Sequence, residues 1–243
     1  MRDILLDIVK HTVPLSAFVT LRVDGTDSVT EISATEEEKL MVLRGKTHLP
    51  VNDFKGLFGI PNIALLNTIL SIPEYTDEKA KYSVVTQQRD SGTQPTTIHL
   101  ENATSDFHND FRLMGANIID TVEPKLKFNV TSWLISFVPS LTGLQRLKYQ
   151  AAAHPEEKAV VFKVADGDIT AQLGDASSHS GSFVFHSGVD AKIKKSISVP
   201  IKHVNTVLSL GGDKVINLGD LGMMISIDSG LAQYDYILPM LSK

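Results

Sequence analysis

The sequence predicts an α+β protein made of two similar domains, and three observations lead to this prediction. A short segment occurs twice, as Asn-Thr-Ile-Leu-Ser at 67–71 and as Asn-Thr-Val-Leu-Ser at 205–209. Each copy ends a short apolar helix pattern and is followed by the alternating apolar and polar residues typical of strands. Paired strand patterns also precede each copy, at 19–32 and at 160–173. Because the order is the same in both halves, the chain is expected to contain two similar units.

The first half is expected to begin with a helix that ends before Pro14, because apolar residues from Ile4 to Val9 recur at helical spacing. A second helix is expected from Pro61 to about Ile72, where Pro73 stops it. The segment 115–127 resembles an extended connector, and 89–95 a polar loop. Alternation predicts strands near 17–23, 28–34, 39–44, 82–88, 96–101 and 107–114.

The second half is expected to repeat this plan. Thr131 or Ser132 is predicted to cap a short helix that Pro139 ends, and Pro200 to open a helix that runs to about Leu210. Gly211 and the glycine after it would stop that helix. Strands are predicted near 144–152, 159–165, 168–174, 182–187, 193–199, 214–218, 223–228 and 233–238.

Composition fits a folded chain of two domains. The 243 residues are 42% hydrophobic and 21% charged, and none is cysteine, which excludes disulfides and cysteine nucleophiles. The apolar run at the N-terminus carries Asp3 and Asp7, so no signal peptide is expected, and no apolar run is long enough for a membrane span. Residues 1–124 hold 11 basic and 18 acidic residues, whereas 125–243 hold 12 and 10. A globally acidic protein can still bind nucleic acid where its basic groups gather on one surface; acidic loops alone would also explain the imbalance.

Two of the predicted helices have outward faces without acidic residues. In the second helix, Ile63, Leu66, Ile69 and Leu70 are expected to point inward, and small polar residues outward. In the helix after Pro200, the expected outward residues are Lys202, Asn205, Thr206 and Ser209, and the inward ones are Ile201, Val204, Val207 and Leu208. Such faces suit a surface along which a polyanion passes closely, or one that packs on another protein element.

Catalytic motifs are not evident. Gly45-Lys46-Thr47 resembles the end of a P-loop, but Leu40 stands where its first glycine is required. His179, His186 and Asp190 are better explained as a hairpin than as a metal site or a hydrolase centre. Since no pair of nucleophile and base emerges, the chain is not expected to be an enzyme, and no cofactor or metal is expected.

With these features, the chain resembles the DNA polymerase sliding clamps, in particular the two-domain clamps of T-even-type bacteriophages. The motifs that carry the resemblance are Gly56–Ile60 before the second helix, Gly143-Leu144-Gln145, Gly230–Tyr234, and the C-terminal Tyr234–Met240. Each motif is short, and the resemblance rests on the order of the motifs along the chain. The resemblance implies a DNA clamp fold, with a first clamp domain at 1–117, an interdomain connector at 118–127 and a second clamp domain at 128–243.

The resemblance further implies a homotrimer that closes into a ring of six similar domains, each with two helices packed on antiparallel sheets. Such a ring would encircle duplex DNA without sequence specificity and would tether the replicative DNA polymerase as a processivity factor. Implied partners are duplex DNA, that polymerase, an ATP-dependent clamp loader, further copies of the chain and the late-transcription apparatus. The implied location is the cytoplasm of an infected bacterial host. The alternative is a structural β-rich virion or tail protein that forms a trimer.

The resemblance also implies two sets of site residues. Basic residues on or near the helices would line the hole and contact DNA, although each is also explained as an ordinary solvated charge: Arg2, Lys10, His11, Arg146, Lys148, Lys194, Lys195, Lys202 and His203. Apolar residues of the connector and of the C-terminal segment would bind partner peptides: Ile118, Ile119, Val122, Tyr236, Leu238, Pro239 and Met240. Two departures from this pattern are that Asp3 and Asp7 are expected on the outward face of the first helix, and that the predicted third helix carries no basic residue.

Overall fold

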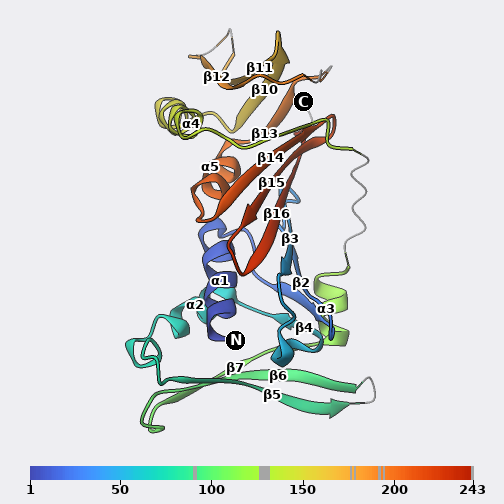
Figure 1. The fold of residues 1–243 in the computed structure, drawn as a ribbon, viewed down its shortest axis with the longest axis vertical. Coiled ribbons are helices and arrows are strands. Elements are labelled where there is room, and N and C mark those ends of the chain that lie inside the picture. The colour runs from blue at the N-terminus through green and yellow to red at the C-terminus, as the bar shows by residue number, and fades with distance from the viewer. Residues whose placement is uncertain are drawn as a thin grey trace. The chain divides into compact units, whose positions relative to one another are not determined.

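The computed structural model describes residues 1–89, 92–125, 132–175, 177, 179–190, 193 and 195–241. The chain divides into two compact units. Unit 1 comprises Met1–Glu37, Leu43–Lys127 and Ser229–Tyr234, and unit 2 comprises Glu38–Val42, Phe128–Asp228 and Asp235–Lys243. Both units combine α-helices with antiparallel sheets, as the sequence predicts (Figure 1).

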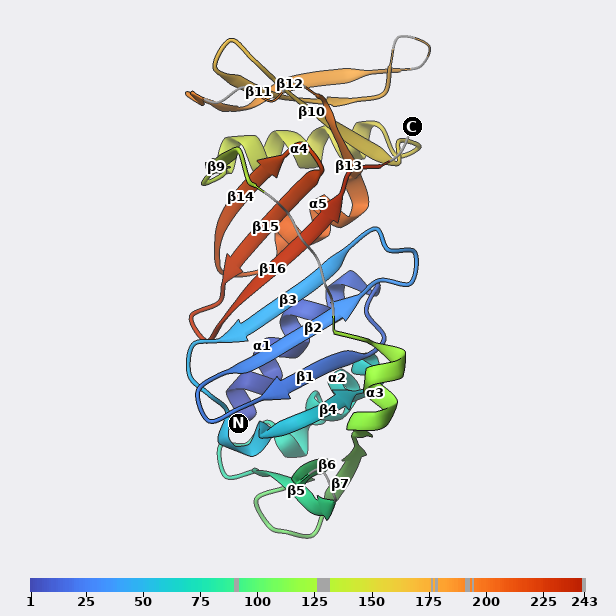
Figure 2. The same ribbon diagram turned by 90° about the vertical axis from the view of Figure 1, so that its right-hand side faces the viewer.

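Unit 1 contains two antiparallel sheets. The strand order is β8-β4-β1-β2-β3 in one and β5-β6-β7 in the other. Helices α1 (Arg2–Thr12) and α2 (Ile63–Leu70) contact each other and lie on one face of the first sheet (Figure 2). Besides three short 3-10 helices at Val13–Leu15, Asn52–Phe54 and Pro73–Tyr75, the remaining elements are β1 (Leu21–Gly25), β2 (Thr30–Thr35), β3 (Val42–Thr47), β4 (Gly56–Ile60), β5 (Lys81–Arg89), β6 (Gly92–Glu101), β7 (His108–Arg112), β8 (Met114–Gly115) and α3 (Ala116–Val122).

Unit 2 repeats this topology. Its sheets have the strand orders β12-β11-β10-β13 and β16-β15-β14-β9. The first order matches β3-β2-β1-β4 of unit 1 strand for strand, and in both units a helix follows the fourth strand and a three-stranded meander follows the helix. The elements are β9 (Ile135–Phe137), α4 (Leu141–Ala153), β10 (Ala159–Ala165), β11 (Asp168–Leu173), β12 (Gly181–Ser187), β13 (Ile197–Pro200), α5 (Ile201–Ser209), β14 (Asp213–Gly219), β15 (Gly222–Asp228) and β16 (Ala232–Pro239). The first three residues of β16, Ala232–Tyr234, belong to unit 1.

Each unit has its own apolar core. In unit 1, the buried rings of Phe54 and Phe58 meet edge to face with centroids 5.5 Å apart. In unit 2, the ring of Phe185 meets that of Phe162 at 5.5 Å and that of Phe137 at 6.0 Å. Edge-to-face contacts of this kind add to the stabilisation that comes from burying the rings, so each unit is stabilised by a core of its own.

Four predicted elements are wrong. Residues 92–95 were expected in a polar loop, but they form the start of strand β6. Residues 144–152 form most of helix α4 and not a strand, and Ile135–Phe137 is a strand where a helix was expected before Pro139. The connector is not extended, because it contains α3. The strand β4 was not predicted, and β1, β2 and β3 begin two to four residues later than expected.

The cause of the error at α4 is local. The hydroxyl of Ser140 accepts a hydrogen bond from the Gly143 amide at 3.0 Å, which caps a helix that begins after Pro139. Gly143 and Leu147 are both buried, and their spacing of four residues places them on one face of a helix. The predicted third helix, which would have carried no basic residue, is therefore replaced by α4 after Pro139, and α4 carries Arg146 and Lys148.

Candidate nucleic-acid interface

Helix α4 is fixed on unit 2 by a close approach to β12. A Cβ atom added to Gly143 would come within 2.5 Å of the backbone oxygen of Phe185, so only glycine allows the helix to lie this near the strand. Leu147 is buried one turn later. With this side inward, Arg146 and Lys148 lie on the two flanks of the helix, and both are exposed. No acidic residue occurs on α4.

Helix α5 presents the outward face that the sequence predicts. Its buried residues are Ile201, Val204, Val207 and Leu208. The hydroxyl of Thr206 donates to the Lys202 carbonyl at 2.9 Å, and that of Ser209 donates to the Asn205 carbonyl at 2.7 Å. Lys202 is exposed and His203 is half-buried. The outward side of α5 is therefore small, polar and basic.

Lys214 adds a basic group to unit 2 that no sequence pattern indicates. It lies at the start of β14, and its ammonium donates a 3.0 Å hydrogen bond to the Gly212 carbonyl. Burial lowers the pKa of Lys214; the Asp213 carboxylate opposes this shift, and the charge of Lys148 adds to it. Lys148 and Lys214 therefore contribute to the same region of positive charge. We call Arg146, Lys148, Lys202 and Lys214 the basic surface of unit 2.

In unit 1, only Lys10 of the three basic residues predicted on α1 is exposed. The guanidinium of Arg2 donates to the carbonyls of Thr76 at 2.6 Å and Asp77 at 3.1 Å, and it lies 5.6 Å from the ring centroid of Tyr82. These bonds tie α1 to the segment before β5, which gives Arg2 a structural role that the sequence did not indicate.

His11 and Asp7 lie in the core of unit 1, and the predictions of a DNA-lining His11 and an outward Asp7 are wrong. His11 is 5% exposed and its ring stacks on that of Tyr234 with centroids 4.5 Å apart. Asp7 is 8% exposed and accepts hydrogen bonds from the hydroxyls of Tyr234 and Ser229, each at 2.8 Å. Because both side chains are buried, His11 does not offer a contact to DNA at this surface, and Asp7 does not place a negative charge there.

The outward face of α2 carries no charge. Asn62 caps the helix through a 3.1 Å bond that its side chain accepts from the Leu65 amide, and Thr68 and Ser71 donate to carbonyls one turn back. Leu65 is exposed, and Ile69 is only half-buried. The helices of unit 1 are thus nearly neutral at their surface, whereas those of unit 2 are basic. Of the remaining predicted DNA contacts, Lys195 is exposed before β13, and Lys194 lies outside the described residues.

The connector helix α3 displays two apolar side chains. Arg22 of β1 donates to Asp120 Oδ1 at 2.5 Å and to the Glu123 carbonyl at 3.2 Å, and Ile119 packs against Gly59. These contacts turn the opposite side of α3 to the surface. There Ile118 is 49% exposed and Val122 is 54% exposed.

Of the predicted partner-binding residues, Ile119, Tyr236 and Leu238 are fully buried, so the prediction that they contact a partner directly is wrong. Pro239 and Met240 are half-exposed. The Met240 amide donates to the Leu221 carbonyl at 2.9 Å, and Leu221 itself is 63% exposed. Leu221 occupies the turn between β14 and β15, and it extends the apolar surface at the C-terminal segment of unit 2.

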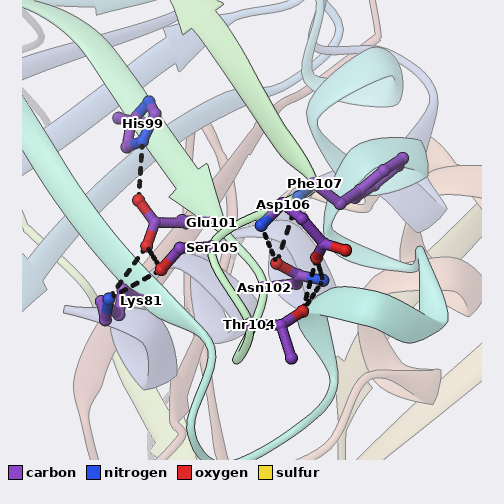
Figure 3. A network of polar contacts seen from close by, with 8 residues as sticks. All are labelled: Lys81, His99, Glu101, Asn102, Thr104, Ser105, Asp106 and Phe107. Atoms are coloured by element: carbon purple, nitrogen blue, oxygen red, sulfur yellow. Dashed lines mark hydrogen bonds and ion pairs between the residues drawn. The ribbon is translucent and has the colours of Figure 1, made fainter.

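The β6–β7 hairpin of unit 1 is held by a polar network (Figure 3). Ser105 and Lys81 hydrogen-bond the Glu101 carboxylate and lower its pKa to about 2. The hydrogen bond to Asp110 raises the pKa of His99. Asn102 closes the turn, since its side-chain oxygen accepts from the amides that follow and its amide group donates to Asp106 at 2.8 Å. The network fixes the geometry of β7 at the end of its sheet.

Within the described ranges, no cluster of three or more histidine, aspartate or glutamate side chains has a metal-binding arrangement. His186 lies on β12 with its ring 4.4 Å from that of Phe137, as expected for a hairpin residue. No helix in the described part of the chain is long and apolar enough to cross a membrane.

Comparisons with solved structures identify the fold. A chain of the structure described as the C-terminal region of FEN-1 bound to A. fulgidus PCNA superposes with a TM-score of 0.69 at 12% identity, covering 100% of this chain and 96% of that one. PCNA from Thermococcus kodakaraensis superposes with a TM-score of 0.65 at 11% identity, covering 98% and 97%. No protein-family model matches the chain. No curated protein matches its sequence significantly.

The chain therefore has the fold of the sliding clamps, the class to which PCNA belongs. The predicted α+β clamp fold, with two similar domains that carry two helices each on antiparallel sheets, is confirmed. At 11–12% identity, the likeness concerns the fold alone.

Proposed function

We propose that this protein is a sliding clamp that encircles duplex DNA and tethers the replicative DNA polymerase. The observation that supports this most directly is the combination of the PCNA fold over the whole chain with acid-free outward faces on α2, α4 and α5. A duplex that passes such faces meets weak, sequence-independent phosphate contacts from Lys10, Lys195, His203 and the basic surface of unit 2. The mechanism is topological and not catalytic: threading retains the DNA.

The clamp acts as a homotrimer, in which three chains with two units each form a closed ring. The strands β7 in unit 1 and β12 in unit 2 are end strands, and among the described residues no further strand pairs with the outer side of either. Pairing β12 of one protomer with β7 of the next is a heterologous contact, and a ring is the arrangement that leaves none of these edges open.

Partners bind the apolar surfaces of the two units. On α3, Ile118 and Val122 are spaced by one helical turn, which suits the apolar side chains of a short peptide. On unit 2, Leu221, Pro239 and Met240 offer a second apolar contact. The partners are the replicative polymerase, an ATP-dependent clamp loader and the late-transcription apparatus. The setting is the cytoplasm of a bacterium infected by a T-even-type bacteriophage.

Retention on DNA of different topology tests the proposal. With its loader and ATP, the protein should remain on nicked circular DNA through gel filtration and should be lost after the circle is cut. A structural virion or tail protein, the alternative function, would show no dependence on DNA topology. The mass in solution should be three times that of the 26.6-kDa chain; a strict monomer at micromolar concentration contradicts the ring.

A further inference from the structure

One aromatic side chain on α4 is unusually accessible. Tyr149 is 70% exposed. Among the residues that the structure describes, no side chain pairs with it through a hydrogen bond or a ring contact. Its ring is therefore free to contact a ligand.

The phase of α4 places this ring between positive charges. Gly143 and Leu147 face the unit, so Gln145, Tyr149 and Ala152 occupy the opposite side of the helix. Arg146 and Lys148 flank that side, one on each edge. Figure 1 shows α4 above α5 on the helical side of unit 2.

The surroundings of Tyr149 favour an anionic ligand. Neither α4 nor α5 contains an acidic residue. The charge of Lys148 helps to lower the pKa of Lys214, which is consistent with positive charge concentrated beside α4. An acidic protein partner would satisfy the charges, but a nucleic acid satisfies both the charges and the exposed ring, because every base has a face on which an aromatic ring can stack.

We propose that α4 binds single-stranded DNA, with the ring of Tyr149 stacked on an unpaired base while Arg146 and Lys148 contact the neighbouring phosphates. This inference rests on the proposed clamp function, in which α4 faces the DNA. In an intact duplex the base faces are covered by their neighbours, so the ring adds little there. At the junction of a duplex with a single strand, unpaired bases are available. The contact would thus hold the clamp at such junctions.

Equilibrium binding to short DNA tests the proposal without loader or ATP. The probes are a fluorescein-labelled oligothymidine of about 16 nucleotides and a labelled duplex of the same length. In low salt, Tyr149→Ala should weaken oligothymidine binding by about 5- to 100-fold, as expected for the loss of one base–aromatic stack. Duplex binding should change less than twofold.

Two further variants separate stacking from other effects. Tyr149→Phe keeps the ring and should bind oligothymidine as the wild type does, which excludes a role of the hydroxyl. Leu141→Ala removes another exposed apolar side chain of α4 and should have no effect. Unchanged oligothymidine binding in Tyr149→Ala overturns the proposal, as does an equal loss on duplex or an equal loss in Leu141→Ala.

The retention experiment on circular DNA keeps this inference distinct from the clamp function. Retention of Tyr149→Ala on circles, together with unchanged oligothymidine binding, leaves the clamp intact and removes only the stacking contact. Failure of the wild type to remain on circles, together with a Tyr149-dependent affinity for oligothymidine, removes the clamp function and leaves a single-strand-binding surface.

Discussion

Tyr234 donates a 2.8 Å hydrogen bond from its hydroxyl to Oδ2 of Asp7, and this bond joins residues 227 positions apart in the sequence. Both residues are buried in unit 1. Ser229 donates a second bond to the same oxygen at 2.8 Å, and His11 stacks on the Tyr234 ring. The segment Ser229–Tyr234 is thus attached to the N-terminal helix of the chain by hydrogen bonds to a charged group.

Tyr234→Phe should lower the free energy of unfolding by about 1.5–3 kcal/mol, because it removes a hydrogen bond to a buried carboxylate and retains the ring. Urea unfolding followed by circular dichroism measures this. Tyr149→Phe is the matched control, since its hydroxyl has no hydrogen-bond partner among the described residues, and it should unfold at the wild-type midpoint. Equal midpoints for all three proteins would show that the Tyr234–Asp7 bond contributes nothing.

The Asp7 carboxylate should also make the stability of the folded protein depend on pH in the acidic range. Burial raises the pKa of Asp7, but hydrogen bonds from His11, Tyr234 and Ser229 together outweigh it and hold the pKa below the ordinary 3.8. The folded state therefore binds this proton less readily than the unfolded chain does. The resulting stabilisation is complete above about pH 3.8 and is lost as pH falls through the folded-state pKa. Asp7→Asn should be less stable at pH 7, and its stability should fall less between pH 5 and pH 3; parallel curves for the two proteins would contradict this.

The network around Asp7 also shows what sequence patterns cannot reveal. The helical spacing of Ile4, Leu5, Ile8 and Val9 correctly predicts α1, since such periodicity is a local property. The burial of Asp7 depends on its hydrogen bond with Tyr234, and no local sequence pattern connects these two residues. Local periodicity therefore places Asp7 at the surface, whereas hydrogen bonds from residues distant in the sequence allow its burial.

At the candidate DNA surface, the exposure of Lys202 follows from the periodicity of α5 and was predicted. Lys214 was missed, because only folding brings it near Lys148. Residues 144–152 were predicted as a strand although α4 had a signal in the sequence: Ser140 after a proline, followed by Leu, Gln, Arg, Lys and Ala, which all favour helix.

Asp120→Ala should loosen α3. The change deprives the buried guanidinium of Arg22 of its carboxylate and leaves it the Glu123 carbonyl, a loss of about 1–3 kcal/mol. Amide hydrogen exchange in α3 should accelerate, and a partner peptide that binds Ile118 and Val122 should bind more weakly. Thr121→Ala, an exposed change on the same helix, is the control and should leave exchange nearly unchanged. Identical exchange in both variants would show that Arg22 does not hold α3.

Val184→Lys should prevent the ring from closing. Val184 lies on β12 and is 40% exposed, and a charged side chain on an edge strand opposes pairing with another strand. Sedimentation should then show monomers in place of the proposed trimer. Val85→Lys, on β5 at the other end of the three-stranded sheet, is the matched control and should leave the trimer intact. Trimers in Val184→Lys, or monomers in Val85→Lys, would place the protomer contact elsewhere.

Arg146→Glu combined with Lys202→Glu should weaken the hold on DNA while the trimer persists. Both side chains are exposed on helices without acidic residues, so the new carboxylates would repel the phosphates directly. When the logarithm of retention is plotted against the logarithm of salt concentration, the line should become shallower. Its slope should change by about 0.9 for each lost phosphate contact. Lys46→Glu with Lys163→Glu makes the same change of net charge at exposed residues of the strands β3 and β10. If that control pair shortened retention as much as the helix pair, the effect would come from net charge alone. A selective loss in the helix pair would instead identify α4 and α5 as the surface that meets the duplex.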